Sequence, residues 1–235
     1  MMKYYFIPYA GGSLATFNHW KKLFAPEIEF TVMELPGHGR RIFEDCIEDF
    51  QEAIDGLYQA LREQITEGTE VYALGGHCLG AVLAAELVFE IQRKNEIPLP
   101  KGIIISGHGS PSYVEQKEKI SKKSELEITE ILKRDGGFSV ESLQPEILEL
   151  LIPVIRSDAS LYESYRYTKK ELPVDVAILY GRNDPKTPFH EVKEWEELIG
   201  TDKEIQFFAF DTDHYFILKE SDKYIETVQR FLERR

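Results

Sequence analysis

Residues 71–80 read Val71-Tyr-Ala-Leu-Gly-Gly-His-Cys-Leu-Gly80, and Ala81-Val-Leu-Ala-Ala85 follows them. The apolar start is typical of a buried strand, and the small residues after Cys78 are typical of a helix packed closely on a sheet. Gly76-His-Cys-Leu-Gly80 therefore predicts a sharp strand–turn–helix, in which glycines allow strand and helix to approach closely. Cys78 occupies the tip of this turn, facing the positive end of the helix. The pattern is that of a nucleophile elbow with cysteine as the nucleophile.

Segments typical of strands and of helices alternate along the rest of the chain. The predicted strands are Tyr4–Ile7, Phe30–Leu35, Val71–Leu74, Gly102–Ser106, Val176–Tyr180 and Ile205–Phe210. The predicted helices are Phe17–Phe24, Ile47–Ile65, Leu79–Lys94, Val192–Leu198 and Ser221–Leu232. Several of the strands are apolar on both faces, as in a covered parallel sheet. This order predicts an α/β fold whose mostly parallel sheet has about six or seven strands flanked by helices.

One long stretch interrupts this alternation. Residues 111–173 contain no convincing strand, but they do contain helix-like runs on either side of Gly136-Gly137. The stretch is too long for an ordinary connection between a strand and a helix. We expect a helical insertion that forms a lid at the carboxyl edge of the sheet, where ligands bind in such folds. The predicted core is then 1–110 and 174–235.

Two further residues stand where partners of a nucleophilic cysteine would be needed. Asp184 follows the strand Val176–Tyr180, and His214 follows the last strand. The chain order Cys78, Asp184, His214 is that of nucleophile, acid and histidine in the α/β-hydrolase fold. We therefore predict a catalytic triad in which Asp184 orients His214 and His214 acts on Cys78.

A triad of this kind needs an oxyanion hole and a substrate pocket. The backbone N–H of Leu79 follows the nucleophile, and the loop Pro8-Tyr-Ala-Gly-Gly12 after the first strand places Ala10 to supply the second donor. His77 is a poor base, because neighbouring side chains at a sharp turn diverge. The expected substrate-binding residues are Tyr9, Gly11, His38, His77, His108 and Tyr215. Asp158, in the insertion, is expected to pair locally with Arg156.

Composition restricts the partners. The 235 residues include 28 Lys and Arg against 41 Asp and Glu, a net charge of −13. So acidic a chain is not expected to bind nucleic acid or an anionic membrane surface. No apolar run approaches the ~20 residues that a bilayer span requires. The only cysteines are Cys46 and Cys78, too few for a disulfide scaffold, so a reduced, cytoplasmic protein is expected. No cluster has metal-ligand spacing, and no cofactor motif is present.

Several of these motifs together resemble one family, the type II, or external, thioesterases of nonribosomal peptide and polyketide synthesis. The matching segments are Ile7–Gly12, Pro36–Arg40, Gly76–Gly80, Pro153–Asp158, Gly181–Asp184 and His214–Leu218. The resemblance implies an α/β-hydrolase with a helical lid, triad roles for Cys78, Asp184 and His214, and oxyanion roles for Ala10 and Leu79. It also implies a monomer that hydrolyses acyl groups from the phosphopantetheine arms of carrier proteins.

The chain departs from the family at the nucleophile, where serine is usual. A thiol ionises more easily than a hydroxyl, and its attack on a thioester exchanges one thioester for another. The acyl-enzyme could then wait for a thiol or amine, so an acyltransferase remains an alternative to a thioesterase. A non-catalytic binding protein on the same fold is a second alternative. Carrier domains are acidic by family resemblance, so Arg40-Arg41 and Lys122-Lys123 are possible docking residues.

Overall fold

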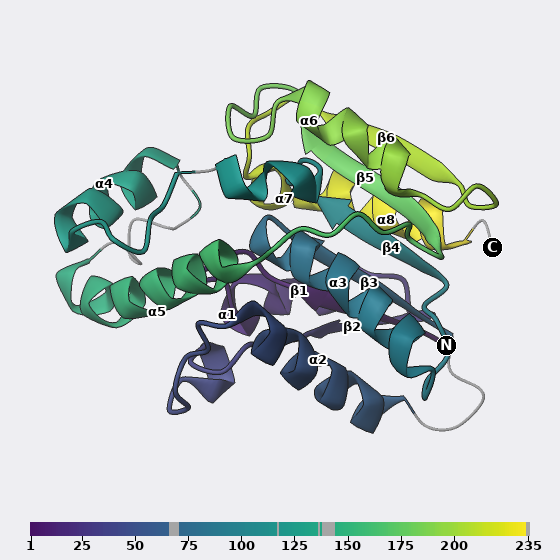
Figure 1. Ribbon diagram of the computed structural model, residues 1–235, viewed down its shortest axis with the longest axis horizontal. Helices are drawn as coiled ribbons and strands as arrows, with labels where there is room; N and C mark the ends of the chain where they lie inside the picture. Colours follow the sequence, from purple (N-terminus) through teal and green to yellow (C-terminus); the bar gives the residue numbers. More distant parts are fainter. Residues whose placement is uncertain (66–70, 117, 136, 138–143, 234–235) are drawn as a thin grey trace.

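A parallel sheet of six strands runs through the centre of the computed structural model (Figure 1). The structure describes residues 1–65, 71–116, 118–135, 137 and 144–233. Within them the strands are β1 (Met2–Ile7), β2 (Ile28–Val32), β3 (Tyr72–His77), β4 (Gly102–Ser106), β5 (Asp175–Gly181) and β6 (Ile205–Phe210). Their order across the sheet is β2-β1-β3-β4-β5-β6, and every neighbouring pair is parallel. The predicted α/β fold with a mostly parallel sheet is confirmed.

Helices cover both faces of the sheet because successive strand residues point to opposite sides. In β1, Tyr5 and Ile7 pack in the core under α2 (Phe50–Gln64) and α3 (Leu79–Lys94), whereas Tyr4 and Phe6 pack in the core under α8 (Ser221–Glu233). The second core also takes Phe17, Trp20 and Phe24 from the segment after β1, which forms α1 (Leu14–Phe17) and the 3₁₀ helix η1 (Asn18–Lys22). Burial on both faces explains the continuous apolar runs of the central strands.

Some predicted elements have different boundaries or a different type. The predicted helix Phe17–Phe24 is the short α1 followed by η1, and Val192–Leu198 is divided between α6 (Phe189–Lys193) and the 3₁₀ helix η5 (Glu194–Leu198). The second strand ends at Val32 and not at Leu35, because its partner β1 runs into Pro8, which has no N–H to continue the ladder. A further short helix, α7 (Phe216–Lys219), follows β6 and was not predicted.

The stretch 111–173 contains helices and, among its described residues, no strand. Its elements are the 3₁₀ helix η3 (Pro111–Gln116), α4 (Glu125–Asp135) and α5 (Pro145–Ser164). The last two share a small core of their own, made of Ile128, Leu132, Ile152 and Ile155. They lie beyond the carboxyl ends of the strands (Figure 1). No helix among the described residues is long and apolar enough to cross a membrane.

Candidate active site

The turn between β3 and α3 places Cys78 in a backbone conformation that only close packing would enforce. Its φ is +54° and its ψ is −117°, an unusual combination for a residue other than glycine. Such a conformation costs about 1–3 kcal/mol. A Cβ on Gly76 would lie 2.0 Å from the Gly80 carbonyl oxygen, so the glycines are required on either side of the turn. The elbow expected from the sequence is therefore present in the fold.

The loops after β1 and β3 meet at the point where the strand order reverses, the usual position of a ligand site in such sheets. Ile7 and Gly76 are partners in the β1–β3 register. A Cβ on Gly80 would lie 2.0 Å from the Ile7 oxygen and 2.4 Å from the Pro8 oxygen. The start of α3 thus rests directly on the end of β1, which brings the elbow against the loop that carries Ala10.

Asp184 and His214 meet across the carboxyl ends of β5 and β6. His214 Nδ1 lies 2.7 Å from Asp184 Oδ2, and both side chains are buried. The backbone N–H of Lys186 donates to Asp184 Oδ1 at 2.8 Å, and the Thr187 hydroxyl donates to Oδ2. Burial alone would raise the pKa of Asp184, but the bonds from His214 and Thr187 outweigh it and lower this pKa to about 2. Asp184 is therefore ionised and fixes the orientation of the imidazole.

The thiol of Cys78 and the imidazole of His214 stabilise each other's charged forms. Burial lowers the pKa of His214, but the Cys78 charge and the Asp184 hydrogen bond outweigh it and raise this pKa to about 9. Burial raises the pKa of Cys78, but the charge of His214, with smaller contributions from Lys186 and the Leu79 amide, lowers it overall. The two opposite pKa shifts therefore favour a thiolate–imidazolium pair.

The loop after β1 forms a tight turn beside this pair. The Gly12 N–H donates to the Tyr9 carbonyl at 2.7 Å, and Gly11, the third residue of the turn, has φ of +72°. A positive φ at this position favours glycine, which explains the Gly-Gly sequence. Ala10 lies at the apex, and the Leu79 amide lies beside Cys78 at the start of α3. The two amides proposed for an oxyanion hole thus belong to neighbouring elements.

Three of the expected substrate-binding residues surround the Cys78–His214 pair. The Tyr215 ring lies 5.4 Å from the Tyr9 ring and 5.2 Å from the His214 ring, centroid to centroid. His108 Nε2 lies 2.7 Å from the hydroxyl of Tyr162, on α5. Burial and the Cys78 charge raise the pKa of Tyr162. Sequence reasoning missed Tyr162, because nothing in its helical context distinguishes it from a core residue.

His77 was expected to contact substrate, and the structure places it elsewhere. Its side chain is fully buried, and its Nδ1 lies 3.0 Å from the Ser106 hydroxyl on β4. The ring packs against His214 at 5.1 Å between centroids and against Phe216 at 5.3 Å. Because β3 is central, the side chain of its last residue points into the core behind His214. His77 therefore offers no surface to a substrate and instead supports His214.

Asp158 also differs from the expectation of a local pair with Arg156. Residues two apart on a helix do not face each other. Arg156 donates to the carbonyls of Ser121 and Lys123 at 2.8 and 2.7 Å. Asp158 instead points into the core domain, where its Oδ2 accepts from the Gly11 N–H at 2.7 Å and lies 2.9 Å from His38 Nε2. Gly11 and His38, expected to bind substrate, are thus engaged by the insertion.

The insertion also reaches the residues around Cys78 through its other helix. Tyr9 donates its hydroxyl to the Gly137 carbonyl at 2.8 Å. Asp135, the last residue of α4, pairs with Lys186 Nζ at 2.6 Å. The same ammonium lies 5.5 Å above the centre of the Tyr215 ring. These contacts hold the insertion against the loops that carry Tyr9 and Tyr215.

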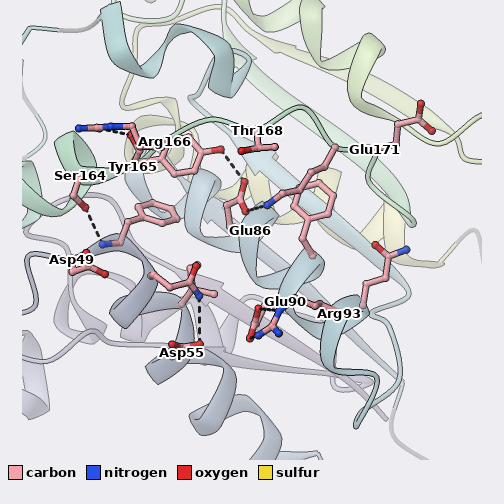
Figure 2. A pocket seen from close by; sticks show the side chains of 16 residues that line it. Asp49, Asp55, Glu86, Glu90, Arg93, Ser164, Tyr165, Arg166, Thr168 and Glu171 are labelled. Carbon is pink, nitrogen blue, oxygen red and sulfur yellow. Dashed lines mark hydrogen bonds and ion pairs between the residues drawn. The ribbon is translucent and has the colours of Figure 1, made fainter.

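A separate cleft of about 970 Å³ lies between α2, α3 and residues 164–171 (Figure 2). Its charged groups are largely paired with one another: Glu86 accepts from the Tyr165 hydroxyl and from Lys170 Nζ, both at 2.8 Å, and Arg93 pairs with Glu90 at 2.6 Å. Cys78, Asp184 and His214 do not line this cleft. Among the described residues there is no group of three or more His, Cys, Asp or Glu side chains that could hold a metal ion.

Comparison with known proteins matches this site to one family. The family model described as Thioesterase domain matches residues 4–232. The gramicidin S biosynthesis protein GrsT of Aneurinibacillus migulanus is 26% identical over 96% of this chain and 86% of its own length. Thioesterase PikA5 of Streptomyces venezuelae is 28% identical over 90% of this chain and 74% of its own length.

Solved structures agree with the sequence comparison. ClbQ from the colibactin NRPS/PKS pathway superposes with a TM-score of 0.89 at 25% identity, covering 99% of this chain and 97% of its own. The type II thioesterase BorB from the borrelidin cluster superposes with a TM-score of 0.86 at 25% identity, covering 97% of this chain and 91% of its own. A match this extensive includes both the sheet and the helical insertion. The chain therefore belongs to the thioesterase family, as a hydrolase of thioester bonds that is similar in fold and sequence to type II thioesterases.

Proposed function

We propose that this thioesterase removes acyl or aminoacyl groups from the phosphopantetheine arms of carrier proteins through an acyl-enzyme on Cys78. The observation that carries the proposal is the charge-coupled Cys78–His214 pair, with Asp184 bonded to the far side of the imidazole at 2.7 Å. A thiolate is a strong nucleophile toward thioesters and needs no general base for its first attack. The similarity to GrsT and PikA5 supports a place in the synthesis of peptide or polyketide products.

In the first half-reaction the Cys78 thiolate attacks the carbonyl carbon of the pantetheine thioester. The carbonyl oxygen becomes negative and accepts hydrogen bonds from the N–H groups of Ala10 and Leu79. When the tetrahedral adduct collapses, the bond to the pantetheine sulfur breaks. His214 gives its proton to that sulfur, and the acyl group remains on Cys78.

In the second half-reaction the neutral His214 takes a proton from water as the water oxygen attacks the Cys78 thioester. The same two amides stabilise the second tetrahedral adduct. Its collapse releases the carboxylic acid and restores the thiolate, with His214 protonated again. Asp184 keeps the imidazole in one orientation throughout and stabilises its charged form.

Intact-mass analysis tests this proposal directly. The wild type, Cys78→Ala and the matched control Cys46→Ala are each mixed with carrier proteins bearing different acyl or aminoacyl thioesters. We expect the wild type and Cys46→Ala to gain the mass of the acyl group and to release free acid, while Cys78→Ala does neither. Hydrolysis by Cys78→Ala at the wild-type rate would show that the nucleophile lies elsewhere. No adduct and no free acid from any variant would instead favour the non-catalytic binding protein.

The cysteine itself favours a second candidate, an acyltransferase with the same first half-reaction. A thioester on Cys78 passes to another thiol with little change in free energy, and amines attack thioesters readily. The two candidates are separated by isolating the acyl-enzyme and adding buffer alone, a free amine, or a second carrier protein. If added acceptors clear the adduct no faster than buffer, the transferase is excluded.

Docking of an acidic carrier cannot depend on net attraction to a chain of charge −13. The suggested basic residues are also paired in part: Arg40 with Glu34 at 3.3 Å, Arg41 with Glu44 at 2.6 Å and Lys123 with Glu118 at 2.8 Å. We therefore propose that apolar contacts and the pantetheine arm supply most of the affinity. We also propose that the protein acts in the cytoplasm as a monomer, where its thiol stays reduced.

A further inference from the structure

Asp158 is the one acidic side chain of α5 that leaves the insertion and enters the core domain's active-site loops. It is 2% exposed, and its Oδ2 accepts the Gly11 N–H at 2.7 Å. The same oxygen lies 2.9 Å from His38 Nε2, in the loop after β2. A buried carboxylate is costly unless it is paired and hydrogen-bonded. Here the pairing comes from His38 in the loop after β2, and the hydrogen bond comes from Gly11 in the loop after β1. Asp158 Oδ2 therefore joins α5 to both loops.

The partner of Asp158 carries a positive charge. His38 Nδ1 lies 3.0 Å from the Pro36 carbonyl, which can only accept, and Nε2 faces a carboxylate oxygen that already accepts from Gly11. Both ring nitrogens therefore donate, so the ring is an imidazolium. Burial alone would lower the pKa of His38, but the bond and charge of Asp158 raise it overall. A carboxylate accepts more strongly from an amide than a neutral oxygen does, so this pair is a firm anchor for the Gly11 N–H.

The amide that Asp158 holds belongs to the oxyanion loop. Gly11 follows Ala10 in the turn closed by the Gly12 N–H and the Tyr9 carbonyl. Fixing the Gly11 N–H fixes the peptide plane between Ala10 and Gly11, and with it the apex of the turn. Further along the same loop, Glu34 accepts the Leu14 N–H at 2.7 Å. The loop is thus anchored at two points by buried carboxylates, of which only Asp158 comes from the insertion.

We propose that Asp158 is a positioning residue, which holds the Ala10–Gly11 turn so that the Ala10 N–H faces the developing oxyanion on the Cys78 adduct. The inference rests on the proposed function. It means that the insertion does more than cover the site: seating α5 on the core completes the oxyanion hole. Nucleophile and oxyanion hole are then assembled by different parts of the chain, and they respond to different mutations.

This separation gives the test. Alkylation of Cys78 by iodoacetamide needs the thiolate but forms no oxyanion. Acylation by S-acetylpantetheine needs the thiolate and also forms an oxyanion, which the oxyanion hole must stabilise. Asp158→Ala and Asp158→Asn are compared with Ser157→Ala, a neighbour on α5 whose hydroxyl donates to the Ile47 carbonyl at 3.2 Å and does not touch the loop. Both rate constants are measured at Cys78 by peptide mass, which separates it from Cys46.

Loss of one oxyanion-hole donor costs about 10²–10³ in rate, so a donor that is present but mispositioned should cost about 10- to 100-fold. We expect Asp158→Ala to lower the acylation rate constant by that factor and to leave alkylation within about twofold of wild type. Asp158→Asn retains an acceptor oxygen and should recover part of the loss, and Ser157→Ala should change neither reaction.

Equal acylation by wild type and Asp158→Ala would overturn the inference, as would a parallel fall in both reactions, which marks a general loss of structure or access. Failure of the wild type to acylate Cys78 while Cys78 still alkylates would instead refute the proposed function. The two failures are therefore distinguished within one experiment.

Discussion

Replacing His214 with asparagine tests whether Cys78 is held as a thiolate. The rise in the pKa of His214 from 6.5 to about 9 corresponds to roughly 3 kcal/mol favouring the charged ring, at about 1.4 kcal/mol per pKa unit. Part of this free energy is the attraction between the imidazolium of His214 and the thiolate of Cys78. The same attraction lowers the pKa of the Cys78 thiol. Without the imidazole, burial remains and raises the pKa of Cys78. We expect the midpoint of its ionisation to move upward, to a pH above that of the wild type.

The substitution is chosen to spare the fold. Asparagine keeps an N–H for Asp184 Oδ2, and Asp184 retains its bonds from the Lys186 and Thr187 amides, 2.8 and 3.3 Å long. The assay is the rate of iodoacetamide alkylation at Cys78 as a function of pH, read by peptide mass. Cys46 is an internal control, since burial and the nearby Asp158 raise its pKa. Its profile should rise only at a pH above that of an ordinary thiol, and at the same pH in both proteins.

In the wild type, alkylation of Cys78 should reach its plateau well below the pH at which Cys46 ionises. In His214→Asn the two cysteines should have similar profiles. The reasoning is refuted if wild-type Cys78 already ionises together with Cys46, or if His214→Asn leaves the Cys78 midpoint unchanged. Cys78 would then be a neutral thiol that depends on general-base catalysis.

Three further predictions follow from named contacts. Acylation needs Cys78 ionised and His214 protonated. In a pH–rate profile, kcat/KM should therefore rise as Cys78 loses its proton and fall again at about pH 9, where His214 loses its proton. Gly76→Ala should lower the free energy of unfolding by about 1–3 kcal/mol or more in urea titrations, because its Cβ would meet the Gly80 oxygen at 2.0 Å. The control Gly56→Ala, in α2 with no atom within 4 Å of the added Cβ, should be neutral or stabilising by up to about 1 kcal/mol. Tyr9→Phe removes the bond to the Gly137 carbonyl, worth about 0.5–1.5 kcal/mol, and should speed alkylation of Cys78 about 2- to 10-fold if the insertion gates access. The control Tyr72→Phe loses a similar hydrogen bond, to the Pro98 carbonyl away from the site, and should leave the alkylation rate of Cys78 unchanged.

The sequence by itself determined the elements whose physics is local. Val71–Gly80 specifies strand, sharp turn and helix because the glycines at 76 and 80 are the only residues that fit against the Gly80 and Ile7 carbonyls. The order of Cys78, Asp184 and His214 could be assigned because the carboxyl ends of parallel strands share one edge of the sheet. Apolar periodicity likewise predicted the covered sheet, since burial on both faces leaves continuous apolar runs.

Only the tertiary structure decided which polar groups face one another across loops far apart in the chain. Asp158 reaches Gly11 and His38, 147 and 120 residues away, because helical geometry turns it away from its neighbour Arg156 and the seating of α5 carries it into the core. His77 is buried behind His214, and Tyr162 comes near Cys78, for the same reason: the direction of a side chain depends on how whole elements pack. Those directions are set by the summed burial of many apolar side chains, which no short motif contains.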